Sequence, residues 1–464
     1  MSTREHADVE LKPDTMKTDP KVVIISAFGL QAELPASKRV CDLLAGFLEL
    51  GIPARLLTPE LPFLTRNSVP DVNLILVKTG LLQVFFENAI GISVRMAQVV
   101  RSLITGFKSE NLEKAVVKPV YLRSGRLLQF YLFFFYSKRL LPLLRMYKTA
   151  SKDIQSLSAG PPVIVITSSA PGSMHLIGYL LKRKFGKKII WVADFQDPLE
   201  RSELLGIKSN FLYSFTDKLV FKHAQLICYP SPTLHKILDQ TARDHGFDIS
   251  EKLYLLPFAI NIPAQACEQR TTPTAKSTKR LLTVFYAGTI YKEMENPLRA
   301  FLHALIRSGS YQFLYAGFTS EVVRKIANEL RIDSELIKIH DVLPKATVLD
   351  LYMHSDILLS LVSFGKEIKV AGSKLFELLA TEKPILLIAP EGADYLDLVN
   401  EVGGVWISKN RPTDILRCLD EIRKEIVQKK RSVFRNKEAQ QRYAAKEIAR
   451  GLLSRLGAIS AGQD

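Results

Sequence analysis

The sequence predicts an α/β protein built from two doubly wound domains, each with a parallel sheet. Short apolar runs alternate with amphipathic stretches of helical spacing, which is the sequence pattern of βαβ units. An aperiodic segment rich in Pro, Thr, Ser and Ala, residues 263–279, interrupts this pattern before it begins again. The chain has 464 residues, more than the roughly 250–300 that a single hydrophobic core normally reaches. Two domains joined by a linker account for all three observations.

The first domain begins with a buried strand expected at residues 22–30. The helical stretch 40–50 follows, and it ends at Gly51, a residue suited to the left-handed turn after a helix. The other strands of this domain are expected at residues 54–58, 163–167, 188–194, 225–230 and 253–258.

The second domain is expected to repeat the pattern after the linker. Its strands are predicted at residues 281–288, 311–317, 337–343, 356–362 and 384–390, with helices such as 320–330 and 373–381 between them. Ligands of doubly wound domains bind beyond the carboxyl ends of the strands. We therefore expect the functional residues in the loops that follow strands.

The composition favours anionic partners. The 63 basic residues exceed the 47 acidic residues by 16, which suits phosphorylated ligands, acidic lipid or nucleic acid. The four cysteines lie far apart, without the spacing of a zinc site or a disulfide framework, and indicate a reducing cytoplasm. Residues 1–20 lack the apolar core of a signal peptide and are predicted to be a disordered lead-in. No run reaches the ~18–20 apolar residues of a membrane-spanning helix.

Three segments, taken in order, resemble the GT-B glycosyltransferases and within them the family 4 group. Residues 373–399 (SKLFELLATEKPILLIAPEGADYLDLV) look like the donor-site helix of that family, with Glu377 in its first turns. Residues 191–199 (WVADFQDPL) are similar to the ADFRDPW stretch of one branch. Residues 167–186 (TSSAPGSMHLIGYLLKRKFG) resemble the strand, turn and histidine-bearing helix of the same branch. The resemblance covers roughly residues 21–406.

The resemblance implies two Rossmann-like domains that face each other across a cleft, with the last helix crossing back to the first domain. The implied boundaries are an acceptor-side domain over residues 21–262, a linker over 263–279, a nucleotide-sugar-binding domain over 280–435, and a crossover helix and tail over 436–464.

The implied activity is transfer of a sugar, hexosyltransferase-like, from a nucleoside diphosphate-sugar to a glycan or lipid-linked acceptor, with retention of anomeric configuration. The sequence contains no Asp-x-Asp motif. The resemblance accordingly implies catalysis without a metal or another cofactor, in which the helix dipole and basic side chains stabilise the leaving diphosphate.

The donor site is assigned by the resemblance and by the chemistry of helix starts. Free amides and the dipole at the N-terminal end of a helix favour phosphate. Ser373 is a natural N-cap residue there, and Lys374 adds a cation for the diphosphate. Leu375 is placed in the donor site with them, and Glu377 is implied to accept hydrogen bonds from the ribose hydroxyls. A solvated surface lysine and an ordinary helix glutamate are the alternatives.

One position departs from the family pattern. Many members carry a second Glu eight residues before the ribose-binding one, where it contacts the donor hexose, and this sequence has Lys369 at that position. Glu367 lies two residues away and is the candidate replacement. The identity of the donor sugar therefore stays open.

Two further loops supply candidates. After the first strand of the second domain, Gly288 lets the backbone approach a ligand, Thr289 can hydrogen-bond phosphate and Lys292 can neutralise it. Tight-turn geometry alone is the alternative there. In the first domain, Gly29 lies in a loop that is usually glycine-rich in the family. Arg39 resembles an arginine that the family keeps facing the cleft, and a surface arginine is the alternative.

Two residues are the catalytic candidates. His175 lies near a helix start in a matched segment, where it can donate to a sugar hydroxyl or position the donor. Asp197, before Pro198, is expected on the acceptor side. The competing interpretations are a structural histidine and a turn in which Asp side chains bond nearby backbone amides.

Residues 118–152 combine aromatic and aliphatic residues with several Lys and Arg. Such a stretch suits a helix in the headgroup region of an anionic membrane. This places the protein in the cytoplasm, at the inner face of the plasma membrane. A helix packed into the N-terminal domain, with its cations in water, is the alternative.

Other classes of function stay open on the sequence alone. A GT-B epimerase or hydrolase would act on the sugar nucleotide itself, and a non-catalytic member would serve as a scaffold or partner protein. Nucleic-acid binding has only the net charge in its favour. Because no nucleic-acid-binding module is recognisable, nucleic acid is not expected as a partner.

Overall fold

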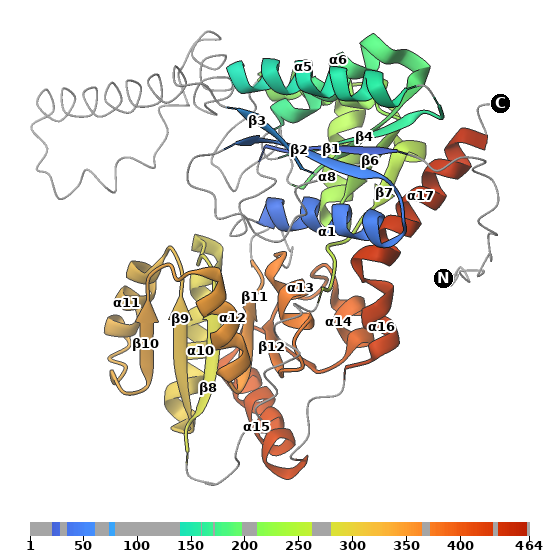
Figure 1. Ribbon diagram of the computed structural model, residues 1–464. Coiled ribbons are helices and arrows are strands. Elements are labelled where there is room, and N and C mark those ends of the chain that lie inside the picture. The colour runs from blue at the N-terminus through green and yellow to red at the C-terminus, as the bar shows by residue number, and fades with distance from the viewer. Residues whose placement is uncertain are drawn as a thin grey trace, which may run out of the picture.

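The computed structural model describes residues 21–27, 35–60, 74–78, 140–158, 160–169, 172–196, 211–261, 280–363, 372–429 and 435–461. These residues form two parallel sheets, each with helices on both faces (Figure 1). The prediction of two doubly wound α/β domains is confirmed.

The first sheet has seven strands in the order β3-β2-β1-β4-β5-β6-β7. They are β1 (Val22–Ile25), β2 (Ala54–Glu60), β3 (Leu74–Lys78), β4 (Val163–Ser168), β5 (Ile189–Asp194), β6 (Leu226–Tyr229) and β7 (Leu253–Leu255). The sequence predicted every one of these strands except β3. The strand order reverses between β1 and β4, and doubly wound sheets bind their ligands beside such a reversal.

Helices cover both faces of this sheet. On one face lie α1 (Pro35–Glu49) and α17 (Ala445–Ala461), and on the other lie α5 (Leu140–Leu157) and α6 (Ser173–Phe185). The other described helices of this domain are α7 (Phe211–His223) and α8 (Pro232–Asp244), with the short 3-10 turns η5 (Gly186–Lys188) and η7 (Ser250–Lys252). Gly51, just after α1, has a φ of 75°, which is the left-handed conformation that the sequence predicts for it.

The second sheet has six strands in the order β10-β9-β8-β11-β12-β13. They are β8 (Leu282–Ala287), β9 (Tyr311–Ala316), β10 (Ile337–His340), β11 (Ile357–Leu361), β12 (Ile385–Ile388) and β13 (Val405–Ser408). Its helices are α10 (Glu295–Ser308), α11 (Ser320–Glu329), α12 (Lys345–His354), α13 (Lys374–Leu379), α14 (Leu396–Val402), α15 (Pro412–Lys429) and α16 (Lys437–Arg442), with the turn η8 (Lys292–Met294). β13 was not among the predicted strands, and α13 is shorter than the predicted helix 373–381.

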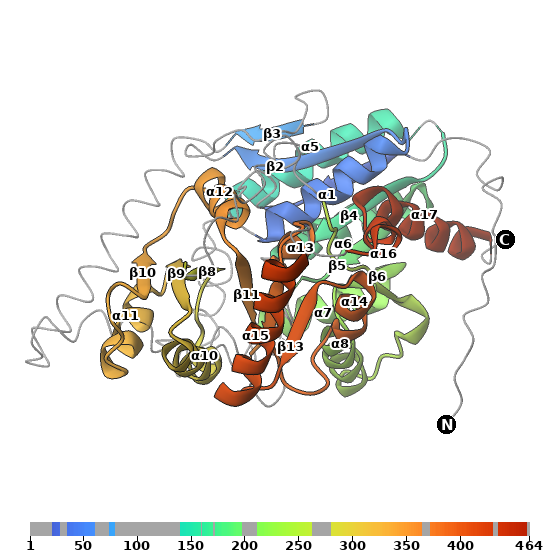
Figure 2. The same cartoon turned by 90° about the horizontal axis from the view of Figure 1, so that it is seen from below.

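The last helix, α17, crosses back and packs against α1 of the first domain (Figures 1 and 2). Ala449 and Leu452 of α17 are fully buried in the same core as Phe47 of α1. The helices approach so closely that a Cβ atom on Gly46 would lie 2.2 Å from the carbonyl oxygen of Ala445. The predicted crossover is thereby confirmed.

Helix α5 overlaps the end of the basic aromatic stretch 118–152. Leu143, Met146 and Ala150 are buried against the first sheet, whereas Arg145 and Lys148 are exposed. This part of the stretch is a helix packed into the domain, and the aromatic run before it lies outside the described residues. Among the described helices, none is long and apolar enough to cross a membrane.

Candidate functional site

The two domains are joined where Asp394 and Tyr395, before α14, reach the first domain. The Asp394 carboxylate accepts hydrogen bonds from the backbone N–H of Thr233, at 3.1 and 3.2 Å, and from its hydroxyl, at 3.0 Å. The Tyr395 hydroxyl donates to the carbonyl oxygen of Pro230, and Tyr395 has a φ of 68°. These contacts fix the second domain against the first turn of α8.

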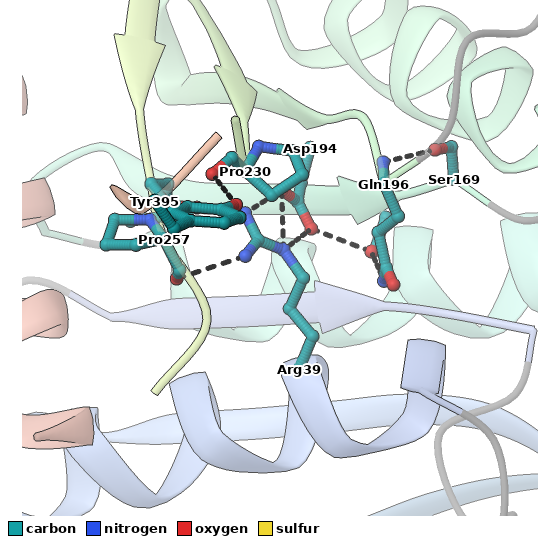
Figure 3. A network of polar contacts seen from close by, with 9 residues as sticks. Arg39, Ser169, Asp194, Gln196, Pro230, Pro257 and Tyr395 are labelled. Atoms are coloured by element: carbon teal, nitrogen blue, oxygen red, sulfur yellow. Dashed lines mark hydrogen bonds and ion pairs between the residues drawn. The ribbon is translucent and has the colours of Figure 1, made fainter. Parts of the chain in front are cut away.

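Arg39 of α1 forms a buried ion pair with Asp194 at the carboxyl end of β5 (Figure 3). The Nη2 and Nε atoms lie 2.8 and 3.1 Å from Asp194 Oδ1, and the side chains are 2% and 0% exposed. The guanidinium also donates to the carbonyl oxygens of Leu256 and Pro257, at 2.7 and 3.1 Å. Burial opposes the charge of Arg39, but attraction to Asp194 outweighs it and raises the pKa of the guanidinium. Arg39 is thus no surface arginine but joins three segments of the first domain.

The Asp194 carboxylate also organises the ends of β4 and β5. Its Oδ2 atom accepts a hydrogen bond from the Ser168 hydroxyl at 2.8 Å, and the Gln196 side-chain amide donates to Ser168 at 2.7 Å. The backbone N–H of Gln196 donates to the Ser169 hydroxyl at 2.9 Å (Figure 3). The start of the segment that leads to Asp197 is therefore held firmly.

His175 lies in the first turn of α6 and is 0% exposed. Its Nδ1 atom is 2.9 Å from the hydroxyl of Thr167 on β4, and its ring centroid is 4.7 Å from that of Phe195. Its Nε2 atom is buried without a hydrogen-bond partner among the described residues. Burial lowers the pKa of His175 to about 3, against a smaller opposing attraction from Asp194, so the ring is neutral at pH 7.

Glu377 of α13 forms an ion pair that the sequence did not suggest. Lys345, the first residue of α12, places its Nζ atom 2.6 Å from Glu377 Oε2, and these side chains are 30% and 16% exposed. Lys374 lies close by: burial lowers its pKa, Glu377 raises it and Lys345 lowers it further. The side chains of Lys345 and Lys374 thus both lie near the Glu377 carboxylate. Together these three side chains carry a net positive charge.

The other residues at the start of α13 contribute less through their side chains. Ser373 occupies the predicted N-cap position, but its hydroxyl makes no hydrogen bond to the helix. Leu375 is 1% exposed and packs in the core of the second domain. A ligand at this helix start would therefore meet backbone and the charged side chains.

Asp42 of α1 brings the first domain within electrostatic reach of Glu377. Its carboxylate accepts hydrogen bonds from Lys38 at 2.5 Å and Asn261 at 2.7 Å. The pKa of Asp42 is raised, chiefly by burial and in small part by Glu377, against the attraction of Lys38. The charged group on α13 therefore lies on the side of the second domain that faces α1 (Figure 1).

The turn after β8 is built on two glycines. Gly288 is buried, its carbonyl oxygen accepts a hydrogen bond from the Tyr315 hydroxyl at 2.7 Å, and Thr289 is half-buried. A Cβ atom on Gly317, after β9, would lie 2.0 Å from that carbonyl oxygen, so only glycine fits there. The sequence singled out Gly288 and missed Gly317. Lys292 lies exposed in η8.

Three predicted site residues, Gly29, Asp197 and Glu367, lie outside the described residues, as does Lys369. Within the described ranges, no group of three or more His, Cys, Asp or Glu side chains could hold a metal ion. The residues that sequence reasoning missed are Lys345, Gly317, and the Asp394–Tyr395 pair. None of them carries a local signal, because each acts through a partner that is distant in the sequence.

Solved structures resemble the chain over nearly its whole length. A glycosyltransferase from Rickettsia africae ESF-5 has a TM-score of 0.54 at 13% identity, covering 95% of this chain and 99% of the other. The catalytic domain of starch synthase IV from Arabidopsis thaliana, bound to ADP and acarbose, has a TM-score of 0.55 at 11% identity, covering 96% and 100%. An α,α-trehalose 6-phosphate synthase from Burkholderia multivorans has a TM-score of 0.54 at 12% identity, covering 96% and 98%.

The chain has the GT-B fold. No family model matches the sequence, and no curated protein matches it either. At 11–13% identity these similarities establish the fold but not the activity. The activity has to be inferred from the residues of the site. In this GT-B arrangement, His175, Arg39 and Asp42 belong to the first domain, and Glu377 and Gly288 belong to the second.

Proposed function

We propose that the protein is a glycosyltransferase that moves a sugar from a nucleoside diphosphate-sugar to an acceptor. The observation that carries this proposal is the placement of Glu377, with Lys345 and Lys374, on the side of the second domain that faces α1. A partly buried carboxylate suits vicinal ribose hydroxyls, and the surrounding cations suit a diphosphate. In support, the similar starch synthase IV structure is bound to ADP and acarbose.

In this proposal each charged group has a separate role. Lys345 occupies Oε2 of Glu377, and Oε1 has no hydrogen-bond partner among the described residues, so it is free to accept a ribose hydroxyl. Lys374 and Lys345 attract the diphosphate. The Gly288–Thr289 turn and the exposed Lys292 form the second wall of the donor site.

The transfer itself is proposed to use one residue on the donor side and one on the acceptor side. His175 donates a hydrogen bond to the donor, and Asp197 acts on the acceptor side. Gly29 and Glu367 are proposed to line the cleft. We propose retention of anomeric configuration and catalysis without a metal, with the leaving diphosphate stabilised by the lysines and by backbone amides.

The donor assignment predicts that Glu377→Gln weakens sugar-nucleotide binding about 10–100-fold, because a charged hydrogen-bond acceptor is worth about 1.5–3 kcal/mol. The measurement is thermal unfolding with UDP-glucose, ADP-glucose and GDP-mannose, each of which stabilises a protein that binds it. Glu382→Gln is the control, because Glu382 is a partly exposed glutamate of the same domain, in an ion pair with Lys437. An unchanged ligand-induced shift in Glu377→Gln would rule out the ribose role.

The same measurement separates the alternatives. A non-catalytic scaffold would be stabilised by none of the three sugar nucleotides. An epimerase would bind one of them and convert it in the absence of any acceptor.

The acceptor is proposed to be a glycan or a lipid-linked molecule, reached at an anionic membrane surface through residues 118–152. Replacing Phe133, Phe134 and Phe135 together with Ser is expected to abolish flotation with anionic liposomes, because the inserted aromatic side chains supply the apolar binding energy. The control is Phe318→Ser, an exposed aromatic residue of the second domain, which should leave flotation unchanged. Flotation of the triple variant at the wild-type level would contradict the membrane contact.

A further inference from the structure

Three buried side chains of the first domain form a hydrogen-bonded chain. Trp191 on β5 donates from its indole Nε1–H to the Thr167 hydroxyl oxygen at 2.9 Å, and that oxygen lies 2.9 Å from His175 Nδ1. All three residues are 0% exposed. Within the described residues, these are the hydrogen bonds of the Thr167 hydroxyl. Its single hydrogen therefore decides which nitrogen of His175 carries the proton.

The Thr167 hydroxyl hydrogen takes part in a hydrogen bond in only one of the two possible arrangements of Trp191, Thr167 and His175. The indole N–H can only donate, so it occupies a lone pair of Thr167. If the Thr167 hydroxyl then donates to Nδ1, the single unpaired group is the Nε2–H of His175. If Nδ1 instead donates to Thr167, both the Thr167 hydrogen and the Nε2 lone pair are left unpaired. Each unpaired buried group costs about 1–3 kcal/mol, so the first arrangement is favoured.

A glycine makes this chain possible. Gly178 lies three residues after His175 on α6, and a Cβ atom there would be 2.2 Å from Trp191 Nε1 and 2.9 Å from Thr167 Cγ2. The indole therefore lies directly against the helix backbone. With any larger residue at position 178, Trp191 could not keep its hydrogen bond to Thr167.

We propose that Thr167, which accepts a hydrogen bond from Trp191, is a positioning residue that fixes His175 as the Nε2–H tautomer, so that it presents a neutral N–H donor to an oxygen atom of the ligand. The Nε2 atom is buried and has no partner among the described residues, and a buried donor of this kind requires an acceptor. The ligand part rests on the proposed function, which supplies two kinds of acceptor oxygen, the sugar hydroxyls and the phosphates. As a neutral ring His175 acts by hydrogen bonding, without gaining or losing a proton.

The test is the tautomer of His175, read from the nitrogen resonances of the full chain labelled with ¹⁵N-histidine. His175→Gln assigns the signal. The expected wild-type spectrum shows protonated Nε2 and unprotonated Nδ1 at pH 7. Thr167→Val removes the hydroxyl whose hydrogen Nδ1 accepts, so the ratio of the two tautomers should fall about tenfold or more. The control is Thr241→Val, a buried threonine of α8 whose hydroxyl donates to the carbonyl oxygen of Ile237, and it should leave the ratio unchanged.

A wild-type protein with protonated Nδ1 would overturn the proposal, and this result needs no variant to fold. An unchanged tautomer in a folded Thr167→Val variant would also overturn it. Adding UDP-glucose, ADP-glucose, GDP-mannose or the free diphosphates then tests the ligand part. A sugar nucleotide that raises the melting temperature without moving the Nε2 resonance refutes the contact. If the nucleoside diphosphate without its sugar already shifts the Nε2 resonance, the acceptor is a phosphate oxygen. If only the intact sugar nucleotide shifts the resonance, the acceptor is an oxygen of the sugar. If no nucleotide binds, the proposed function fails while the tautomer result stands.

Discussion

Replacing Asp194 with Asn is expected to lower the free energy of unfolding by about 3–5 kcal/mol. The change keeps the shape of the side chain but leaves the Arg39 guanidinium, 2% exposed, without a countercharge. Breaking a buried ion pair by removing one partner is strongly destabilising because the remaining charge stays buried and uncompensated. The same carboxylate holds Ser168, so the variant also loosens the end of β4.

Urea unfolding of Asp194→Asn and of a control variant measures this effect. The control is Asp239→Asn, which removes an exposed ion pair with Arg243 within α8 and should cost less than about 0.5 kcal/mol. The double replacement Arg39→Met with Asp194→Leu should be less harmful than Asp194→Asn, because it leaves no buried charge. A loss below about 1 kcal/mol in Asp194→Asn would show that water reaches the pair.

Acidification is expected to destabilise the wild-type protein through His175. The pKa is about 3 in the folded chain and about 6.5 when unfolded, so between these values the unfolded state binds the extra proton. The free energy of unfolding therefore rises with pH in this window, by about 1.4 kcal/mol per pH unit. Above pH 6.5 both states hold neutral His175 and the dependence on this residue ends. Lowering the pH from 6.5 to 5 should cost about 2 kcal/mol through this residue.

The comparison is between the wild type and His175→Gln, measured by urea unfolding at pH 5 and pH 7. The variant should lose this part of the pH dependence, because glutamine does not titrate. His223, whose pKa is also lowered chiefly by burial, adds a dependence of the same sign in both proteins, so the difference between them isolates His175. His354→Gln, on the exposed end of α12, is the control. Equal slopes in the wild type and His175→Gln would mean that the ring is hydrated.

The fold follows from local patterns to a large extent. Buried parallel strands are continuous apolar runs, and these marked both sheets. The two strands that were missed, β3 and β13, lie at the edges of their sheets, and most of their described residues are only partly buried. The crossing of α17 back to the first domain was predicted from the resemblance alone and the strand order was not predicted, since both depend on pairings that no local pattern contains.

For the same reason, the sequence names candidate site residues but not the partners that they contact in the fold. The sequence marked Glu377 and His175 as candidates, but not the groups that set their chemistry. Lys345 is 32 residues from Glu377, and Asp194 is 155 residues from Arg39. Such partners meet only when the strands and helices have packed. Lys345 therefore looked like any surface lysine, although it holds one oxygen of the proposed ribose-binding carboxylate.

The packing of α17 on α1 has a consequence for how the chain folds during synthesis. Domains generally fold as units while the chain is still growing, with the N-terminal one first. Here the core between α1 and the first sheet contains Phe47 and is completed by Ala449 and Leu452. These two residues come more than 180 residues after β7 ends at Leu255. The first domain must therefore wait, with an apolar face uncovered, until the last helix has left the ribosome. Ribosome-bound chains that end before α17 should accordingly be the ones that recruit chaperones.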